Sequence, residues 1–349
     1  MTDKPIIWIL LGPRKGDNDQ LRALAGRLSG LVVEKQLKAH PFWRLVPPRW
    51  MGASLRRLLP LSRAEMRAPW PDLVLVIGRR FVPVARWIQE QSGGWTRIVA
   101  LGRPCAPAEW FDLVVSTPQY GLRSAPNLIS LPLALSKTVP GREDGADRAH
   151  LLLVGGPSWP WVLDAKALLA GAESLSERSR SEGGRLWVAF SRRTPASIRK
   201  ALMSHIRATG TPADIVGEQG ARLSFADAMA QAETISVTAD SVSMISQAVM
   251  TGRPVGIVPV RRALWGHLWT AGADALRALG LAKPRDLRLF WDNLARLGIG
   301  GTVEAPRATH MPPLLDEVAD RIDRMLDLRV FLKQNSGAGE KEEKLDRVS

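Results

Sequence analysis

Short apolar, β-branched runs alternate with segments of helical periodicity along the chain. The apolar runs predict strands at 5–11, 72–77, 96–101, 112–116, 128–133, 150–155, 185–190, 213–217, 234–238 and 254–259. Segments with a helical period lie between them, at 18–29, 80–91, 161–180, 195–208, 223–232, 241–251 and 262–271. Strands that are apolar on both faces and separated by helices are typical of parallel sheets covered by helices. The pattern therefore predicts an α/β fold.

The alternation is interrupted near the middle of the chain. Residues 136–149, SKTVPGREDGADRA, lack apolar periodicity and are rich in charge, glycine and turn formers, as a linker is. A chain of 349 residues is long enough for two domains. We expect a Rossmann-like domain over 1–140 and a second over 141–312, facing each other across a cleft. A helix at 313–334 is expected to cross back to the N-terminal domain, and 335–349 to form a disordered tail.

Composition limits the partners and the compartment. The formal net charge is +14, which favours anionic partners such as phosphates, nucleic acid or an acidic membrane surface. No recognised nucleic-acid module accompanies this charge, so we expect no specific nucleic-acid partner. The single cysteine, Cys105, excludes an intrachain disulfide and suits a reducing cytosol. No apolar run is long enough for a signal peptide or a membrane span, so we expect a cytoplasmic protein, peripheral on the inner membrane at most.

The stretch 40–70 interleaves tryptophan, leucine and arginine with one acidic residue, Glu65. This composition fits an interfacial membrane helix or an acceptor site for a lipid-linked sugar. It also fits, slightly better, a helical excursion that packs on the first domain and exposes a basic face. The five histidines, at 40, 150, 205, 267 and 310, share no spacing that indicates a catalytic pair or a metal site.

A glycine loop follows the first predicted strand, in LLGPRKGDNDQ. Gly12 and Gly16 permit a tight turn, and Asp17 or Asn18 is expected to cap the helix that follows. The loop is neither GxGxxG nor a Walker A motif. Its basic side chains, Arg14 and Lys15, are available to an anion, and Asp17 is available to a hydroxyl proton. The alternative is an ordinary strand-to-helix turn with exposed charges.

Three strand ends in the second half carry small, hydroxyl or cationic residues. Gly155 and Gly156 would let a diphosphate approach backbone N–H groups, with Pro157, Ser158 and Pro160 starting a helix. The next strand ends in Ser191, Arg192, Arg193 and Thr194, and guanidinium groups match phosphate well. A further strand ends in Asp240, Ser241 and Ser243, which either cap a helix or bind a ligand at its N-terminus. The carboxyl ends of parallel strands share one edge, so these residues are expected to converge.

The motifs GPRKGDNDQ, LLLVGGPS, FSRRTP and VTADSVSMISQA, within residues 5–330, resemble the bacterial relatives of the plant elongated-mitochondria fission proteins. That family is treated as glycosyltransferases of the GT-B fold. The resemblance implies two Rossmann-like domains, a nucleotide-sugar donor held by the C-terminal one, an acceptor on the N-terminal side, and catalysis without a metal or another cofactor. Where many relatives carry a Glu early in the donor-binding helix, this chain has Gln247, which is the closest candidate for a substrate contact there, and Glu218 is a substitute candidate for ribose recognition.

These observations favour a glycosyltransferase that transfers a sugar from a nucleotide-sugar to a cell-envelope glycan or lipid at the cytoplasmic membrane face. Asp17 is the candidate base for the acceptor hydroxyl. Arg192, Arg193 and the N–H groups near Gly156 and Ser241 are expected to meet the departing diphosphate. The alternative is a non-catalytic, membrane-associated adaptor that retains the GT-B fold, as the fission role of the plant proteins suggests.

Overall fold

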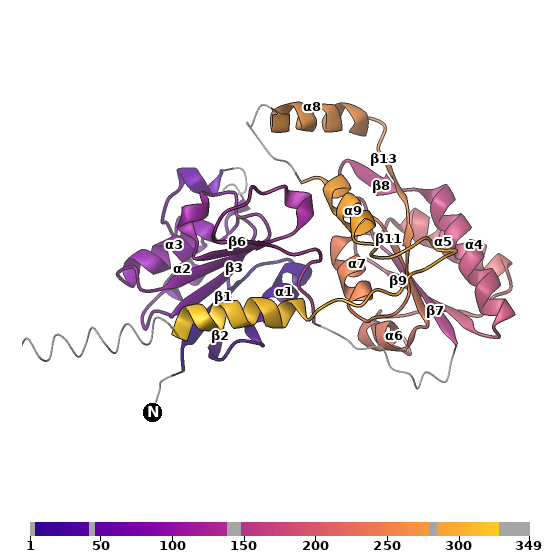
Figure 1. The fold of residues 1–349 in the computed structure, drawn as a ribbon, viewed down its shortest axis with the longest axis horizontal. Helices are drawn as coiled ribbons and strands as arrows, with labels where there is room; N and C mark the ends of the chain where they lie inside the picture. The colour runs from indigo at the N-terminus through magenta and orange to yellow at the C-terminus, as the bar shows by residue number, and fades with distance from the viewer. Residues whose placement is uncertain (1–3, 42–45, 138–147, 279–284, 328–349) are drawn as a thin grey trace, which may run out of the picture. The chain divides into compact units, whose positions relative to one another are not determined.

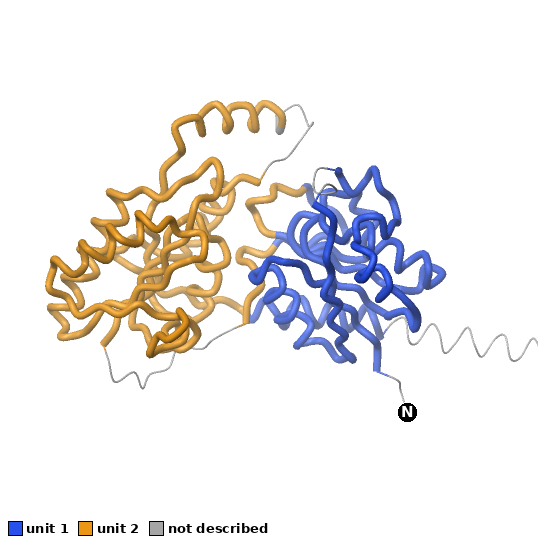
Figure 2. Tube along the Cα trace, turned by 180° about the vertical axis from the view of Figure 1, so that it is seen from behind, with its two compact units in different colours: residues 1–116, 123–130, 313–349 blue, residues 117–122, 131–312 orange. Residues whose placement is uncertain are grey.

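The computed structural model describes residues 4–41, 46–137, 148–278 and 285–327 (Figure 1). The chain divides into two compact units (Figure 2). Unit 1 comprises Met1–Ser116, Arg123–Ser130 and Pro313–Ser349, and unit 2 comprises Thr117–Leu122 and Leu131–Pro312. Each unit contains a parallel sheet with helices, as the alternating pattern predicts. None of the described helices is long and apolar enough to cross a bilayer.

Unit 1 is built on a six-stranded parallel sheet with the order β2-β1-β3-β4-β5-β6. Its strands are β1 (Ile6–Leu11), β2 (Leu31–Gln36), β3 (Leu73–Ile77), β4 (Arg97–Leu101), β5 (Leu113–Ser116) and β6 (Leu128–Ser130). The middle strands are apolar on both faces, and side chains such as Ile7, Leu75 and Val99 are fully buried. Strands that are apolar on both faces are typical of parallel sheets, because the crossover helices between such strands cover both faces of the sheet.

The helices of unit 1 come from both ends of the chain. They are α1 (Lys15–Ala25), α2 (Pro60–Ala64), α3 (Val82–Gln91) and a helix at 314–327. The last one is attached to this unit by polar contacts: Arg27 Nε lies 3.1 Å from Asp316 Oδ1, and Arg321 Nη2 donates to the Pro126 carbonyl at 3.1 Å. The remainder of the expected 313–334 helix and the expected tail at 335–349 lie outside the described residues.

Unit 2 is built on a five-stranded parallel sheet with the order β10-β9-β7-β11-β12. Its strands are β7 (Ala149–Val154), β9 (Arg185–Phe190), β10 (Ala213–Ile215), β11 (Thr234–Thr238) and β12 (Val255–Val258). A short antiparallel pair joins β8 (Trp161–Leu163) to β13 (Val260–Arg262). Its helices are α4 (Ala165–Ser181), α5 (Ala196–Ala208), α6 (Phe225–Gln231), α7 (Val242–Val249), α8 (Gly266–Ala278) and α9 (Leu287–Arg296).

The passage of the chain into unit 2 differs from the boundary expected within 136–149. Residues 131–135 already belong to unit 2, since the Ala134 N–H donates to Ser246 Oγ at 2.9 Å. The segment 117–122 also belongs to unit 2, because the Asp286 N–H donates to the Gln119 carbonyl at 2.8 Å. Composition could mark the linker but not these contacts between distant residues, and 138–147 lies outside the described residues.

The helix predicted at 161–180 is wrong at its start. Residues 161–163 form β8, and α4 begins only at Ala165. The Asp164 side chain caps this helix by accepting the Lys166 and Ala167 N–H groups at 3.0 and 3.3 Å. The prediction also missed β2, an edge strand with largely exposed side chains, and α9. A functional site is expected at the carboxyl edges of the two parallel sheets, where the strands end.

Candidate functional site

Each parallel sheet has one point where the strand order reverses direction. In unit 1 the chain moves from β1 to β2 on one side and then to β3 on the other. In unit 2, β9 and β10 lie on one side of β7, and β11 and β12 lie on the other. Ligands of open α/β sheets bind outside the carboxyl ends of the strands at such switch points. The two candidate sites are therefore the carboxyl edges at β1/β3 and at β7/β11.

At the edge of unit 2, the loop after β7 is bonded to the end of β11. The Gly155 N–H donates to Thr238 Oγ1 and the Gly156 N–H donates to Asp240 Oδ2, both at 2.8 Å. A Cβ on Gly155 would lie 2.1 Å from Asp240 Oδ2, so only glycine fits there. These contacts correct one expectation. The two N–H groups already have acceptors in this structure and are not open donors for a diphosphate.

Asp240 is buried at this junction and accepts a hydrogen bond from the loop after β7. Its side chain is 1% exposed, and its Oδ1 has no hydrogen-bond partner among the described residues. Burial raises the pKa of the Asp240 carboxyl, while hydrogen bonds from Thr238 and Gly156 and the charge of Arg193 oppose that rise. Asp240 was predicted to touch the ligand directly. Its burial against Gly155 and Gly156 makes it a residue that positions the loop.

The start of α7 is neither capped by its own side chain nor fully exposed. Ser241 occupies the N-cap position, but its side chain makes no capping hydrogen bond. Ser243 is exposed and Gln247 is half-buried. Ser246 is fully buried, where its hydroxyl donates to the Val242 carbonyl at 2.8 Å and accepts the Ala134 N–H. The first turn of α7 therefore has no cap from its own N-cap side chain and lies at the carboxyl edge, where N–H groups attract anions.

The turn after β9 is fastened to the loop after β7. The Ser191 N–H and the Thr194 hydroxyl both donate to the Val154 carbonyl, at 2.8 and 3.0 Å. Arg193 Nη1 donates to the Pro157 carbonyl at 3.0 Å, whereas Arg192 is exposed and has no hydrogen-bond or ion-pair partner among the described residues. The expected convergence of the three strand ends is thus present in the structure.

Residues 157–160 do not start a helix, which corrects a further expectation. Ser158 and Trp161 exchange two backbone hydrogen bonds of 2.9 Å, forming a turn into β8. The buried Ser158 hydroxyl accepts from Arg285 Nη1 at 2.9 Å. Trp291, on α9, donates from Nε1 to the Ala239 carbonyl at 2.9 Å. Arg285 and Trp291 were missed because the segment 285–296 was not predicted to be part of the site.

Glu218 is not brought to α7. It follows β10, and β9 and β7 separate that strand from β11. The Glu218 carboxylate instead lies 2.6 Å from Arg199 Nη1, on α5. An ion pair with a neighbouring helix explains this carboxylate without a ribose, so its role as a substitute for a Glu at position 247 has no support in the arrangement of the strands.

At the edge of unit 1 there is a cavity of about 360 Å³. Three consecutive strand ends contribute to its lining, with Gly12, Pro13 and Arg14 after β1, Ala39, His40 and Pro41 after β2, and Gly78, Arg79, Arg80 and Phe81 after β3. Leu10, Asp17, Arg57 and Ile77 complete it. The structure therefore brings Gly12, Arg14 and Asp17 together as expected, whereas Lys15 and Gly16 are exposed and do not line the cavity. His40, Arg57, Arg79 and Arg80 were not predicted.

Asp17 lies in a mixed environment within this cavity. Its side chain is 40% exposed, and Oδ2 lies 4.0 Å from Arg14 Nη1. Burial raises the pKa of the Asp17 carboxyl, and the charges of Arg14 and Arg80 oppose that rise. The expectation that Asp17 or Asn18 caps α1 is wrong, because the helix begins at Lys15. Asn18 instead accepts the Gly12 N–H at 3.0 Å and donates to the Gly12 carbonyl at 2.8 Å, which fixes the loop.

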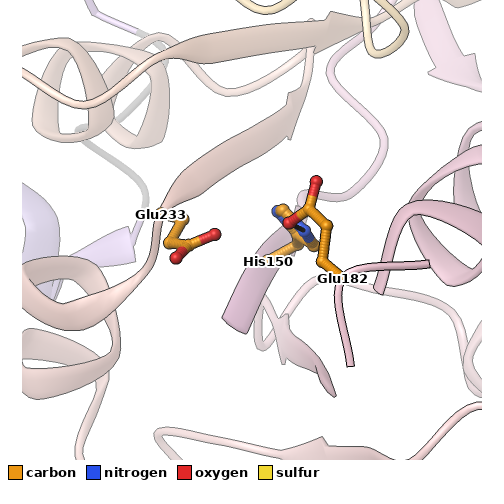
Figure 3. Close-up of side chains that lie close together, drawn as sticks. All are labelled: His150, Glu182 and Glu233. Carbon is orange, nitrogen blue, oxygen red and sulfur yellow. Dashed lines mark hydrogen bonds and ion pairs between the residues drawn. The ribbon is translucent and has the colours of Figure 1, made fainter. Parts of the chain in front are cut away.

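Two carboxylate arrangements resemble metal sites. Asp17 and Asp19 are two residues apart on α1, so they project from different faces of the helix, and Asp19 lies 4.0 Å from Arg22. Figure 3 shows His150, Glu182 and Glu233, whose candidate ligand atoms lie within 4.8 Å of one another. Both ring nitrogens of His150 are occupied, by Thr234 Oγ1 at 2.9 Å and Glu182 Oε2 at 3.0 Å. His150 lies near the amino end of β7, opposite the candidate site.

The stretch 40–70 is not one interfacial helix. Its described residues contain only the short helices η2 (Pro48–Trp50) and α2, and 42–45 lies outside the described residues. Arg57 is 2% exposed, and Trp70 packs edge-on against Trp8 at 6.1 Å between ring centroids. This packing favours the excursion folded onto unit 1 over the membrane helix.

Two Rossmann-like units with these topologies define the GT-B class of fold. The sequence signature of the family described as "Mitochondrial fission ELM1" matches residues 15–326, and the chain belongs to this family. The uncharacterized protein RP120 of Rickettsia prowazekii is 21% identical over 295 residues, which cover 72% of this chain and 82% of that protein. The UDP-GlcNAc 2-epimerase of Methanocaldococcus jannaschii is similar in structure, with a TM-score of 0.51, 12% identity and coverage of 93% of this chain and 99% of the epimerase. That likeness concerns the fold alone.

Proposed function

We propose that this protein is a metal-independent glycosyltransferase of the GT-B class that binds a nucleotide-sugar at the carboxyl edge of unit 2. The observation that carries the proposal is the convergence of three loops, 155–158, 191–194 and 240–243, at the β7/β11 switch point. Open α/β sheets bind nucleotides at this position. The epimerase that shares the fold takes, by its name, a nucleotide-sugar as its substrate.

The exposed groups at this edge suit a diphosphate. Arg192 offers a guanidinium with no protein partner among the described residues, and the first turn of α7 adds N–H groups beside the exposed Ser243 hydroxyl. Guanidinium and helix N-termini both stabilise phosphate charge, which develops on the leaving group during sugar transfer. Asp240 serves this site indirectly, by holding the Gly155–Gly156 loop against the start of α7.

Asp17 is the proposed base for the acceptor hydroxyl. A carboxylate is an effective general base when its pKa lies closer to the working pH than in water. Burial moves the pKa of Asp17 in that direction. The carboxyl is also 40% exposed within the cavity of unit 1, so an acceptor hydroxyl has access to it.

We place the acceptor, a cell-envelope glycan or lipid, at the cytoplasmic membrane face. The support comes from α8, which lies apart from the sheet of unit 2 in Figure 1. Leu264, Trp265, Leu268 and Trp269 at the start of this helix are 50–84% exposed. Its other face is anchored through the buried Thr270 and through Asp274, which lies 2.6 Å from Arg288. Exposed tryptophan and leucine beside the exposed Arg261 are typical of an interfacial helix.

Calorimetric titration with UDP, GDP and CMP sugars tests the donor assignment. Arg192→Ala and Ser243→Ala are each expected to lower the affinity for the nucleotide by about tenfold to hundredfold, because each removes a hydrogen bond to a charged group worth about 1.5–3 kcal/mol. Arg180→Ala is the matched control, since Arg180 is an exposed arginine near the end of α4, at the opposite edge of the sheet. A non-catalytic adaptor, the alternative, need bind none of these nucleotides.

A further inference from the structure

Arg57 is a buried arginine that lines the cavity of unit 1 without a carboxylate partner. It is 2% exposed. Its guanidinium donates to Met51 Sδ at 2.8 Å, to the Arg80 carbonyl at 3.4 Å and to the Val46 carbonyl. No carboxylate among the described residues forms an ion pair with it. Buried charges are normally paired, because removing an ion from water costs several kcal/mol.

The cations around Arg57 add to its charge. Burial, together with the charges of Arg79 and Arg80, lowers the pKa of Arg57 to about 10. The cavity lining also includes Arg14 and the half-buried His40, against a single carboxyl, that of Asp17. Four arginines and one carboxyl line the cavity, and the Arg57 guanidinium is buried there without a carboxylate partner among the described residues. An anion in the cavity would offset that charge.

The position and shape of the cavity indicate what kind of anion it admits. The lining loops follow β2, β1 and β3, so the cavity lies at the switch point of the sheet of unit 1. A volume of about 360 Å³ falls within the roughly 300–1,000 Å³ of small-molecule sites. Leu10, Ile77 and Phe81 add apolar surface beside the arginines. This lining suits an anionic group attached to a less polar body.

We propose that this cavity binds the phosphate or diphosphate group of a second, phosphorylated substrate, separate from the nucleotide-sugar of unit 2. The guanidinium fork of arginine pairs with phosphate oxygens through two parallel hydrogen bonds, which lysine cannot match. The binding of a phosphate stands on the cavity alone. The further step, that the phosphorylated ligand is the sugar acceptor presented to Asp17, rests on the proposed function.

Inorganic pyrophosphate, titrated calorimetrically into the full chain, tests the proposal. Arg57→Met and Arg79→Ala are expected to lower the affinity for pyrophosphate by about tenfold or more, the loss that follows from one hydrogen bond to a charged group. Arg56→Ala is the matched control, because Arg56 is an exposed neighbour that does not line the cavity. If Arg57→Met fails to fold, the exposed Arg79 still decides the question. Equal pyrophosphate affinity in Arg56→Ala and Arg79→Ala overturns the proposal.

Parallel titrations with UDP separate this inference from the donor assignment. UDP affinity is expected to be unchanged in Arg79→Ala and reduced in Arg192→Ala. If Arg192→Ala and Ser243→Ala leave UDP affinity unchanged, the donor assignment fails while the pyrophosphate result stands. If Arg79→Ala weakens UDP and pyrophosphate together, the cavity holds the nucleotide itself, and the second substrate is refuted.

A final arm distinguishes the two sources of the phosphate. A soluble sugar 1-phosphate is titrated in solution, and vesicles that carry a polyprenyl phosphate are tested by sedimentation. Binding of either one that is lost in Arg79→Ala and retained in Arg56→Ala supports the proposal and names the source. Binding of neither, together with no binding of pyrophosphate, contradicts it.

Discussion

Replacing Gly155 with alanine tests the junction that holds the candidate donor edge together. An added Cβ would lie 2.1 Å from Asp240 Oδ2 and 2.6 Å from its Cγ, far inside van der Waals contact. Asp240 is 1% exposed, so its carboxylate cannot move into solvent without opening the buried junction. Any movement also breaks the 2.8 Å hydrogen bond from the Gly156 N–H.

The magnitude follows from these two effects. Overpacking a close-packed site costs about 1–3 kcal/mol. Losing a hydrogen bond to a charged group costs about 1.5–3 kcal/mol. We therefore expect Gly155→Ala to lower the free energy of unfolding by about 2.5–6 kcal/mol and to weaken nucleotide binding, because the loop no longer lies against the start of α7.

A double-mutant cycle with Asp240→Ala isolates the contact. Removing the carboxylate makes room for the new methyl group, so Gly155→Ala should cost at least about 1 kcal/mol less in the Asp240→Ala background than in the native chain. Urea unfolding, followed by circular dichroism and by tryptophan fluorescence, gives the free energy of unfolding of all four proteins. Coincident transitions by the two probes indicate two-state unfolding, so that these free energies can be compared. Strictly additive costs, or a Gly155→Ala protein as stable as the native one, would refute the reasoning.

Three further outcomes are expected. Burial lowers the pKa of His150 below its ordinary value, so its contribution to stability is present above about pH 6.5 and is lost as the pH falls; His150→Asn should flatten that slope between pH 7.5 and 5.5 by up to about 1.4 kcal/mol per pH unit, and an unchanged slope in urea unfolding would contradict this role. Trp265→Ser combined with Leu268→Ser should abolish sedimentation with anionic vesicles, and Leu61→Ser, which changes a still more exposed leucine in the stretch 40–70, should not; the reverse result would assign membrane contact to that stretch. Ser246→Ala should cost about 1–3 kcal/mol in urea unfolding, because it leaves the Ala134 N–H without its acceptor, and should leave UDP affinity unchanged; a loss of UDP affinity at unchanged stability would contradict the structural role of Ser246.

The sequence determined the elements whose signal is local. Apolar runs predicted every strand of the two parallel sheets except the exposed edge strand β2, and the glycine, hydroxyl and arginine residues at their ends predicted the two edges where candidate residues gather. Parallel strands place their carboxyl ends together whatever their order, so the convergence of 155–158, 191–194 and 240–243 required no knowledge of tertiary contacts. The direct binding roles of these residues stay predictions until the titrations are done.

Only the tertiary structure decided which polar groups are already satisfied. Gly156 and Asp240 are 84 residues apart in sequence, and their hydrogen bond turns a predicted ligand contact into a buried support. Arg57 belongs to a stretch whose composition suggested a membrane surface, yet the fold buries it in a cavity beside Arg79 and Arg80. Periodicity and composition report what each segment prefers by itself, whereas burial and hydrogen-bond partners depend on which distant segments the fold brings into contact.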